Sequence, residues 1–510
     1  MPAGVASDGV LGERWNFAVD VFATNAERAG KTAYTDDRRS ITYGELERDA
    51  RRFARLVAEN GLRREERIVL FMLDSIELPI AYLGALYAGV IPVVVNTMLQ
   101  ANDVAYVIRH AEARAVFASA ALAKTYEPAL AQVRSGGHDP QLVVADPELP
   151  LPALLADRPA DTYADDIAFW LYSSGSTGKP KAVVHTHANI HHTVELYGKP
   201  VMGVTADDTV LSAAKLFFAY GLGNALTFPL SVGASVVLMA ERATPAAIFE
   251  RLKKHRCTVF CGAPTTYVGM LASKDLPARS EVALRVCTSA GEALPEDVGN
   301  KFTEHFGAYI LDGIGSTEML HIYISNALGD VAYGTSGRPV PGYEIALRDE
   351  EGQPVPAGEL GELWVKGPSA ALMYWRNRAR TTQTFHGPWM KTGDKYRQLP
   401  SGHYAYAGRS DDMLKVSGQY VAPVEVEFAL QSHASVLEAA VVGKLDADGL
   451  MRTCAYVVLR EGHAGNDELV LGLKGHVKAL LAPHKYPREV FFVEELPKTA
   501  TGKIQRFRLR

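Results

Sequence analysis

A short segment rich in glycine and hydroxyl groups carries residues suited to binding a polyphosphate. It reads Tyr172-Ser-Ser-Gly-Ser-Thr-Gly-Lys-Pro-Lys181 and follows the apolar run from Ile167 to Leu171. Glycine lets backbone N–H groups turn toward an anion, hydroxyls add hydrogen-bond donors, and lysines add positive charge. The segment is not a Walker A loop, which has four residues between its first glycine and the Gly-Lys pair. By itself it would be interpreted as an ordinary turn between strands.

Four more polar motifs follow this segment along the chain. They are Asp312-Gly-Ile-Gly-Ser-Thr-Glu318, Lys391-Thr-Gly-Asp394, Gly408-Arg-Ser-Asp-Asp412 and Pro497-Lys-Thr-Ala-Thr-Gly-Lys503. Together with the first segment they resemble the ordered motifs of the adenylate-forming superfamily, which contains acyl-CoA synthetases, adenylation domains and firefly-type luciferases. The resemblance extends over most of the chain. It implies an enzyme that joins a carboxylate to the α-phosphate of ATP, expels pyrophosphate, and passes the acyl group to coenzyme A.

The resemblance also implies a role for individual residues. Two anions must meet in the first step, so catalysis depends mainly on positioning and on charge neutralisation. The matching lysine, Lys503, is expected to bridge the carboxylate and the α-phosphate. Thr317 is expected to bind phosphate, and Glu318 to hold the Mg²⁺ that accompanies ATP. Asp394 is expected to accept hydrogen bonds from the ribose hydroxyls, assisted by Arg409.

Further nucleotide contacts are expected along three segments. The phosphate-binding residues would be Ser173, Ser174, Gly175, Ser176, Thr177, Gly178 and Lys179. The adenine base would lie between two segments, in contact with Ala290, Gly291, Glu292, Asp312, Gly313 and Ile314. Asp312 would lie near the exocyclic amine. Many relatives carry an aromatic residue where this chain has Ile314, so apolar contact is expected to replace base stacking.

The C-terminal part is expected to move between the two half-reactions. In the superfamily this domain rotates about a hinge that matches Asp411, withdraws the catalytic lysine, and brings in the loop that here begins at Lys415. Gly418 should border the pantetheine channel, where a side chain would block passage. Lys503 also resembles the lysine that protein acetyltransferases modify in several relatives, and acetylation would remove the charge needed for adenylation.

Two segments are expected to bind the carboxylic acid. In relatives, the counterparts of 215–223 and 319–322 line the acyl pocket. The expected substrate contacts are Phe218, Ala219, Tyr220, Gly291, Gly315, His321 and Ile322. They would enclose a short, flat, mostly apolar cavity that fits one aromatic ring.

The strings AAKLFFAYGLGNALTFP and DGIGSTEMLHIYISN resemble those of bacterial benzoate-CoA ligases, which favours benzoate as the acid. Alternatives are ligases for 4-hydroxybenzoate, 2-aminobenzoate or cyclohexanecarboxylate, and an adenylation enzyme that loads a separate carrier protein. A nucleotide-binding regulator without catalysis is a further alternative, which the joint presence of Lys503, Glu318 and Asp394 disfavours.

The elements that must position these residues follow from hydrophobic periodicity. Strand-like runs alternate with amphipathic helices such as Tyr43 to Asn60 and Thr244 to His255, which predicts α/β layers around largely parallel sheets. After about Ser336, short runs broken by Gly and Pro predict antiparallel strands. We therefore expect a large N-terminal domain of stacked α/β sheets over 1–408, with a β-rich, barrel-like subdomain at 336–408. A small, mobile α+β domain would cover 409–510.

Composition narrows the possible partners. The chain has 510 residues, 47% hydrophobic and 22% charged, with a net charge of -5. This balance is that of a globular protein and provides no basic surface for nucleic acid. The N-terminal residues lack the features of a secretory signal, and no apolar run is long enough to cross a membrane, so a cytoplasmic protein is expected. The sequence leaves open whether it is a monomer or a homodimer. The four cysteines have neither zinc-site nor disulfide spacing.

Overall fold

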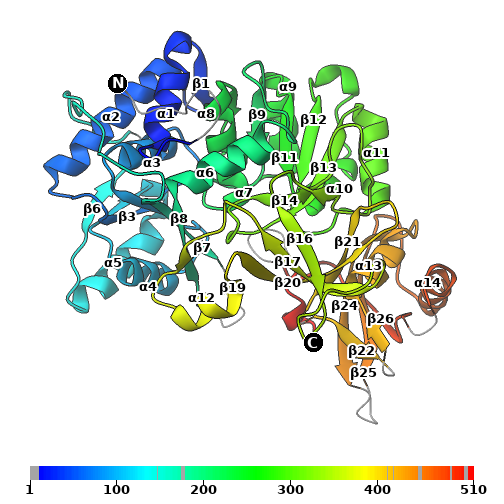
Figure 1. Ribbon diagram of the computed structural model, residues 1–510. Coiled ribbons are helices and arrows are strands. Elements are labelled where there is room, and N and C mark those ends of the chain that lie inside the picture. Colours follow the sequence, from blue (N-terminus) through cyan, green and yellow to red (C-terminus); the bar gives the residue numbers. More distant parts are fainter. Residues whose placement is uncertain are drawn as a thin grey trace.

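The computed structural model describes residues 11–145, 148–173, 179–410, 412–416, 419–445, 451–482, 485–498 and 504–510. Two large sheets and their helices make up most of the molecule, and smaller sheets follow them along the chain (Figure 1). This arrangement confirms the predicted class, a large α/β part with a smaller C-terminal domain.

A seven-stranded sheet is built from the first half of the chain. Its order is β18 (Met373–Tyr374), β8 (Lys181–Thr186), β7 (Ile167–Ser173), β4 (Ile91–Val94), β3 (Arg67–Phe71), β5 (Ala115–Ala118) and β6 (Gln141–Val144). The pairs from β7 through β6 are parallel, whereas β8 and β18 run antiparallel to their neighbours.

Helices cover both faces of this sheet, as Figure 1 shows, with α2 (Tyr43–Glu59) and α3 (Glu77–Tyr87) on one side and α4 (Ala101–Ala111) and α5 (Ala123–Ser135) on the other. Strand β3 is apolar almost throughout because alternate side chains enter different cores. Ile68 packs in the core beneath α2 and α3, and Val69 packs in the core beneath α4 and α5. Helix α2 begins with a capping box between Thr42 and Glu45.

A nine-stranded sheet contains the central part of the chain. Its order is β15 (Arg338–Pro339), β14 (Ile322–Ser325), β13 (Tyr309–Gly315), β12 (Val286–Ser289), β11 (Val259–Gly262), β9 (Thr209–Ser212), β10 (Ser235–Val237), β1 (Thr32–Thr35) and β2 (Ser40–Thr42). The strands from β13 to β1 are parallel, and the outer ones are antiparallel. The edge hairpin β1–β2 therefore comes from a part of the chain far from its neighbour β10.

Seven more helices precede or follow strands in this part of the described chain. They are α1 (Phe17–Thr24), α6 (His187–Thr193), α7 (Ala219–Leu222), α8 (Phe228–Val232), α9 (Pro245–Lys254), α10 (Pro264–Leu271) and α11 (Glu296–Phe306). The segments Val194–Gly198 and Gly223–Thr227 are π-helical. Short 3₁₀ turns occur at Ala26–Arg28, Ala120–Leu122, Arg279–Glu281 and Arg506–Arg508.

The Gly- and Pro-rich region forms an antiparallel sheet, as predicted. It comprises β16 (Glu344–Arg348), β17 (Leu360–Lys366), β19 (Phe385–His386), β20 (Trp389–Gln398) and β21 (Tyr404–Arg409), with helix α12 (Arg378–Thr384) beside it. Strand β21 leads the chain directly into the C-terminal part.

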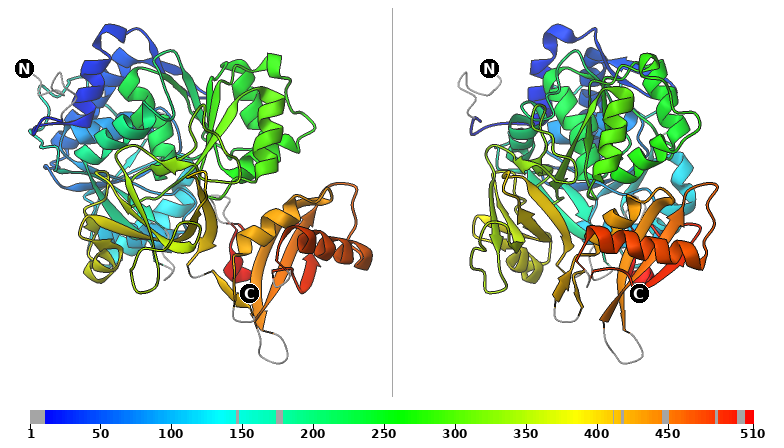
Figure 2. Two further views of the ribbon diagram at one scale, coloured as in Figure 1. Left: turned by 45° about the vertical axis from the view of Figure 1, so that its right-hand side comes forward. Right: turned by 90° about the vertical axis from the view of Figure 1, so that its right-hand side faces the viewer.

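The C-terminal residues form a separate core. Their elements are β22 (Leu414–Val416), β23 (Gln419–Val421), α13 (Pro423–Gln431), β24 (Val436–Leu445), β25 (Met451–Leu459), α14 (Asp467–Leu480) and β26 (Glu489–Phe492). Figure 2 shows this orange and red part on one side of the rest. Contacts with the large part include an apolar cluster that joins Ala293 and Leu360 to Val424, and an exposed ion pair between Lys274 and Glu461 at 3.1 Å.

None of the described helices combines the length and the apolar character required to span a membrane. All four cysteines are buried free thiols.

Candidate active site

The glycine- and hydroxyl-rich segment connects β7 to β8. Ser173 ends β7 and pairs with Lys181 at the start of β8. The Ser173 hydroxyl is buried and has no hydrogen-bond partner among the residues described. Burial lowers the pKa of Lys181, an effect that the nearby Glu318 opposes. Lys179 is exposed, and its Nζ lies 5.7 Å from the centre of the Tyr106 ring.

Several predicted site residues lie outside the described part of the chain. They are Ser174, Gly175, Ser176, Thr177, Gly178, Asp411, Gly418 and Lys503. Lys415 lies in β22, and only its backbone is described.

The glycines of the motif from Asp312 to Glu318 are needed because another strand passes close to them. Residues Asp312 to Gly315 end β13, which pairs antiparallel with β14. A Cβ atom on Gly313 would lie 2.7 Å from the Ile324 carbonyl oxygen, and one on Gly315 would lie 2.5 Å from that of His321. Side chains at these two positions would therefore push β14 away. The glycines place the predicted adenine-binding segment against the start of the predicted acyl-binding segment.

Asp312 is a buried carboxyl group at the end of β13. Burial raises its pKa to about 8, opposed by the Ser289 hydroxyl and the Leu294 N–H. Its Oδ2 accepts a long hydrogen bond of 3.5 Å from the Leu294 N–H. Within the described residues, neither Oδ1 of Asp312 nor Oγ of Ser289 reaches hydrogen-bond geometry with a partner. Two buried polar atoms are thus available to a ligand at this point.

The other residues predicted around adenine differ in exposure. Ala290 is buried, Gly291 is exposed with a φ of +97°, and Ile314 is half-buried against the main core. Glu292 is half-buried, and its Oε1 accepts a hydrogen bond of 3.3 Å from the backbone N–H of Ile504. The C-terminal tail therefore reaches the predicted nucleotide-binding segment at the residue that follows Lys503.

Thr317 and Glu318 are held by neighbouring strands. Nε2 of the buried His185 in β8 donates to the Thr317 carbonyl at 2.7 Å. The backbone N–H of Ala371 donates to the Glu318 carbonyl at 2.8 Å, and the Tyr374 hydroxyl donates to Glu318 Oε1 at 2.7 Å. These contacts fix both the backbone and one carboxylate oxygen of the predicted metal ligand.

The Glu318 carboxylate fits the requirements of Mg²⁺. This cation is usually held by one or two carboxylates together with phosphate oxygens and water. Among the described residues there is no group of three or more His, Cys, Asp or Glu side chains that could hold a metal ion. An ion held by Glu318 would therefore take its remaining ligands from the phosphates and from water.

Asp394 and Arg409 face each other across two strands. They are paired residues of β20 and β21, and Arg409 Nη1 donates to Asp394 Oδ1 at 3.0 Å. Arg409 also donates to the Thr392 carbonyl at 3.1 Å. Asp394 is 9% exposed, so the guanidinium offsets the charge of a largely buried carboxylate. The structure thus brings together the two residues predicted at the ribose.

The two predicted acyl-binding segments meet in the structure. Tyr220 lies in α7, and its ring centre is 5.6 Å from that of His321. The Tyr220 hydroxyl shares a hydrogen bond of 2.6 Å with Thr288, and the Tyr220 carbonyl accepts one of 3.4 Å from His321 Nε2. Ala219 is buried beside Tyr220, Phe218 caps the helix, and Ile322 begins β14.

Aromatic rings enclose His321 on several sides. Its ring centre lies 5.0 Å from that of Tyr197 and 4.6 Å from that of Phe228. Burial lowers the pKa of His321 to about 3, so the imidazole is neutral at pH 7. Because Nε2 donates to a carbonyl oxygen, Nδ1 is an unprotonated acceptor. It is buried and has no hydrogen-bond partner in the described structure.

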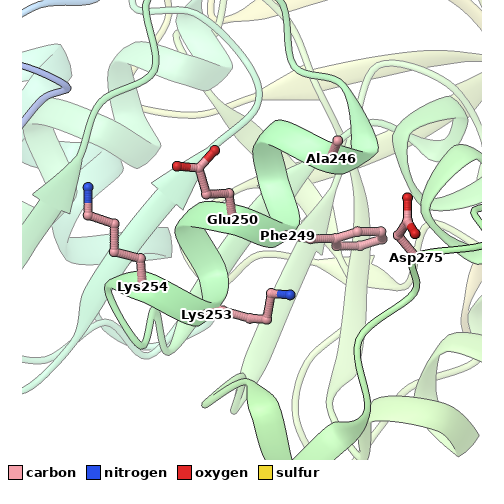
Figure 3. A pocket seen from close by; sticks show the side chains of 6 residues that line it. All are labelled: Ala246, Phe249, Glu250, Lys253, Lys254 and Asp275. Carbon is pink, nitrogen blue, oxygen red and sulfur yellow. The ribbon is translucent and has the colours of Figure 1, made fainter.

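A surface hollow lies elsewhere in the nine-stranded layer. It has a volume of about 530 Å³ and is lined by Ala246, Phe249, Glu250, Lys253, Lys254 and Asp275 (Figure 3). None of these residues belongs to the motifs above, and the lysine side chains extend from α9 (Figure 3). The hollow therefore shares no lining residue with the predicted site.

Sequence reasoning missed the residues that support the site. His185 and Tyr374 contact Thr317 and Glu318, yet neither belongs to a motif identified from the sequence. Tyr374 lies in β18, a strand of only two residues, so no periodic pattern marks it. His185 stands in the apolar run after the phosphate segment, where a histidine is unusual and provides a weak signal.

Comparison with known proteins agrees with this geometry. Residues 21–375 match the family described as AMP-binding enzyme, and residues 425–503 match the AMP-binding enzyme C-terminal domain. A benzoate–CoA ligase of Thauera aromatica is 53% identical over 98% of this chain and 96% of that protein. A 4-hydroxybenzoate–CoA/benzoate–CoA ligase of Rhodopseudomonas palustris is 44% identical over 97% of this chain and 94% of its own length.

Solved structures give the same result. A benzoate CoA ligase from Burkholderia xenovorans LB400 is 59% identical, with a TM-score of 0.92 over 97% of this chain and 100% of that chain. An anthranilate CoA ligase in complex with anthranoyl-AMP is 39% identical, with a TM-score of 0.93 over 98% of this chain and 97% of that chain.

Proposed function

Because this chain belongs to the AMP-binding enzyme family, we propose that it is an ATP-dependent ligase that joins an aromatic carboxylate, in the first instance benzoate, to coenzyme A. The observation that carries the proposal is that the predicted adenine-binding segment and the predicted acyl-binding segment meet at Gly315 and His321. It places an aromatic-lined region next to a buried carboxyl group and a fixed glutamate. Relatives named as benzoate–CoA ligases over nearly the whole chain support the choice of acid.

The first half-reaction makes an aryl-adenylate. A carboxylate oxygen of the acid attacks the α-phosphorus of ATP, and the bond to the bridging oxygen of the leaving pyrophosphate breaks. Asp312 and Ser289 would bind adenine, and Asp394 would accept from the ribose hydroxyls. Glu318 would hold Mg²⁺, which neutralises phosphate charge when bound. Lys503 would offset the charge that develops between the carboxylate and the α-phosphate.

The second half-reaction makes the thioester. The sulfur of coenzyme A attacks the carbonyl carbon of the adenylate, the bond from that carbon to the phosphate oxygen breaks, and AMP leaves. We place the domain boundary at 408/409 and the hinge at Asp411, with Lys415 and Gly418 on the coenzyme A side after rotation. Strand β21, whose Arg409 still pairs with Asp394, ends just before the proposed hinge, and the elements after it have a core of their own, which supports a hinge at this point of the chain.

A ring substituent is a second possibility that one observation favours. Nδ1 of His321 is a buried acceptor with no hydrogen-bond partner in the described structure, and a hydroxyl or amino group on the ring would satisfy it. Relatives include a 4-hydroxybenzoate–CoA/benzoate–CoA ligase and an anthranilate CoA ligase. Hydroxy- and aminobenzoates therefore belong among the candidate substrates.

A panel of acids tests the proposal. Release of AMP that depends on coenzyme A should be measured with benzoate, hydroxybenzoates, 2-aminobenzoate, cyclohexanecarboxylate, acetate and a long-chain fatty acid. We expect benzoate to give the highest kcat/KM and the alkyl acids to be poor substrates. Higher activity with a carrier protein than with free coenzyme A would refute the ligase, and preference for an alkyl acid would refute the aryl site.

A further inference from the structure

A buried carboxylate outside the proposed chemistry contacts the segment that leads to the acyl-binding residues. Asp74 lies in the connection from β3 to α3 and is 5% exposed. Its two oxygens accept from the backbone N–H of Leu216, at 3.3 Å each. Leu216 follows β9 of the nine-stranded sheet, whereas Asp74 follows a strand of the seven-stranded sheet. This contact therefore joins the two large layers next to the predicted acyl site.

The turn after Leu216 is tightly coupled to helix α7. The Phe218 N–H donates to the Lys215 carbonyl at 3.0 Å, and the Leu222 N–H donates to the Phe218 carbonyl at 2.8 Å. Gly221 packs so closely on the turn that a Cβ atom there would lie 2.1 Å from the Lys215 carbonyl oxygen. A displacement of Leu216 would consequently move α7 as a unit.

Helix α7 in turn positions the rings of the acyl site. Tyr220 is held at its hydroxyl by Thr288, at 2.6 Å, and its carbonyl accepts from His321 Nε2. The start of α7 has no such side-chain cap of its own. Asp74 thus fixes the backbone that leads into α7, whereas Thr288 fixes the hydroxyl end of the Tyr220 side chain.

The charge of Asp74 has a partner on the same turn. Burial raises the pKa of Asp74 to about 6, opposed by the charge of Lys215 and by the Leu216 N–H, so the carboxylate is mostly ionised at neutral pH. The Lys215 amino group donates to the carbonyls of Met239 and Glu241. Burial of an ionised carboxylate costs free energy that one N–H and one nearby cation offset only in part. Stability alone therefore gives no reason for a carboxylate at this position.

We propose that Asp74 is a positioning residue for the acid substrate: by fixing Leu216 it places α7, and with it Tyr220 and His321, at the acyl site. This inference rests on the proposed function, because it takes Tyr220 and His321 as acid-binding residues. Asp74 acts through the turn and not by contact with nucleotide or acid. Its loss should therefore change the affinity for the acid and leave that for ATP unchanged.

The kinetic test compares Asp74→Ala with Asp74→Asn in the full-length protein. Asp74→Ala should raise KM for benzoate about tenfold, with KM for ATP changed less than about twofold. Asp74→Asn keeps an oxygen that accepts from the Leu216 N–H and should restore most of the acid KM. Equal increases in both KM values, or an unchanged acid KM in Asp74→Ala, would overturn the inference. If Asp74→Ala does not fold, Asp74→Glu, which shifts the oxygens by one methylene, is judged by the same criterion.

A matched control separates positioning from general destabilisation. Asp208 directly precedes β9, the strand that Leu216 follows; it is 3% exposed and accepts from Arg285 and Thr258. Asp208→Ala should lower the melting temperature at least as much as Asp74→Ala and leave the acid KM unchanged. A rise of the acid KM in both variants would show that any buried carboxylate has this effect and would reject the proposal.

Hydrogen exchange gives a test that needs no substrate. In the ligand-free protein, Asp74→Ala should speed exchange at the Leu216 amide and in the peptide covering 214–223. Unchanged exchange there would refute the coupling, whatever the enzyme's substrate. If the wild-type protein activates no aromatic acid, the proposed function fails, and the exchange result still decides whether Asp74 fixes the turn.

Discussion

At the scale of single residues, burial sets the protonation of the groups around the site. It raises the pKa of Asp312 to about 8 and lowers that of His321 to about 3. At pH 7, in the absence of ligand, the carboxyl is mostly protonated and the imidazole is neutral. Both positions thus present uncharged polar groups, which suits the uncharged rings of adenine and of an aromatic acid.

Asp312→Asn should reveal the raised pKa as a pH-dependent gain in stability. The folded state keeps the Asp312 proton up to about pH 8, while the unfolded chain loses it near pH 4. The contribution of Asp312 to the free energy of unfolding of the wild-type protein is therefore lost as pH rises from about 4 to 8. Asparagine does not titrate, so the variant should be similar to wild type at pH 4 and more stable by up to a few kcal/mol at pH 8. Urea denaturation at pH 5, 7 and 9 measures this, and a difference independent of pH would contradict it.

Tyr374→Phe should weaken metal-dependent binding of ATP. The hydroxyl donates to Glu318 Oε1 at 2.7 Å, and its removal frees the carboxylate to rotate. We expect about a tenfold higher Mg²⁺ requirement for adenylation and weaker Mn²⁺ binding in the presence of ATP, measured by electron paramagnetic resonance. Tyr34→Phe removes a buried hydroxyl that donates to the Ala225 carbonyl at 3.0 Å and serves as the control. An equal change in both variants would reject the role of Tyr374.

At the scale of elements, the close passage of β13 and β14 joins the two halves of the site. The glycines of β13 give β14 room, so His321 follows the Ser-Thr-Glu motif after a sharp turn. Leu320 in this turn has a φ of +64°, a conformation that costs a leucine roughly 1 kcal/mol or more. The backbone is thus strained at Leu320, where the predicted nucleotide-binding and acid-binding segments meet.

Gly315→Ala should therefore cost both stability and activity. Its Cβ atom would meet the His321 carbonyl oxygen at 2.5 Å, so β14 must shift. We expect a loss of about 1–3 kcal/mol in unfolding free energy and a larger fall in acid turnover. Gly472→Ala in α14 is the matched control, because no atom lies within 4 Å of the added methyl group. It should be neutral or stabilising by up to about 1 kcal/mol. Calorimetry on both variants measures the two changes in unfolding free energy, and an equal loss in both would contradict the prediction.

Much of this arrangement could be predicted from the sequence. Helices such as α2 and α9 carry strong periodicity, and their predicted bounds agree with the structure to within one residue at each end. The motif residues Asp394 and Arg409 were predicted at one site and are adjacent across two strands. Strand β18 and the π-helical segments could not be predicted, because tertiary contacts and not local patterns define them. The support that Tyr374 and His185 give to Glu318 and Thr317 is likewise a product of the fold.

At the scale of the whole molecule, the C-terminal tail connects the two domains at the nucleotide segment. Ile504 contacts Glu292, and Arg506 forms a partly buried ion pair with Glu427 of α13, at 2.7 Å. The tail is thus fixed to the C-terminal domain and also reaches the large domain. In the proposed two-step cycle the contact of Ile504 with Glu292 must break when the C-terminal domain rotates, whereas the pair of Arg506 with Glu427 moves with that domain.

Lys503→Ala should separate the two half-reactions. Loss of the cation should reduce benzoate-dependent ATP–pyrophosphate exchange by at least about a thousandfold, while thioester formation from supplied benzoyl-AMP should remain within about tenfold of wild type. Acetylation of Lys503 should give the same pattern, because it removes the same charge. Lys498→Ala, which removes an ion pair with Glu438, should affect neither step strongly. Equal losses in both half-reactions would contradict the assigned role.

The position of the β1–β2 hairpin at the edge of the nine-stranded sheet affects how the protein is made. Tyr34 pairs with Val236, about 200 residues further along, and the strands of the other large sheet come largely between them. On the ribosome, the first hairpin must wait until β10 has been synthesised before it can pair. Fragments that end before β10 should therefore leave that hairpin edge uncovered and prone to aggregation.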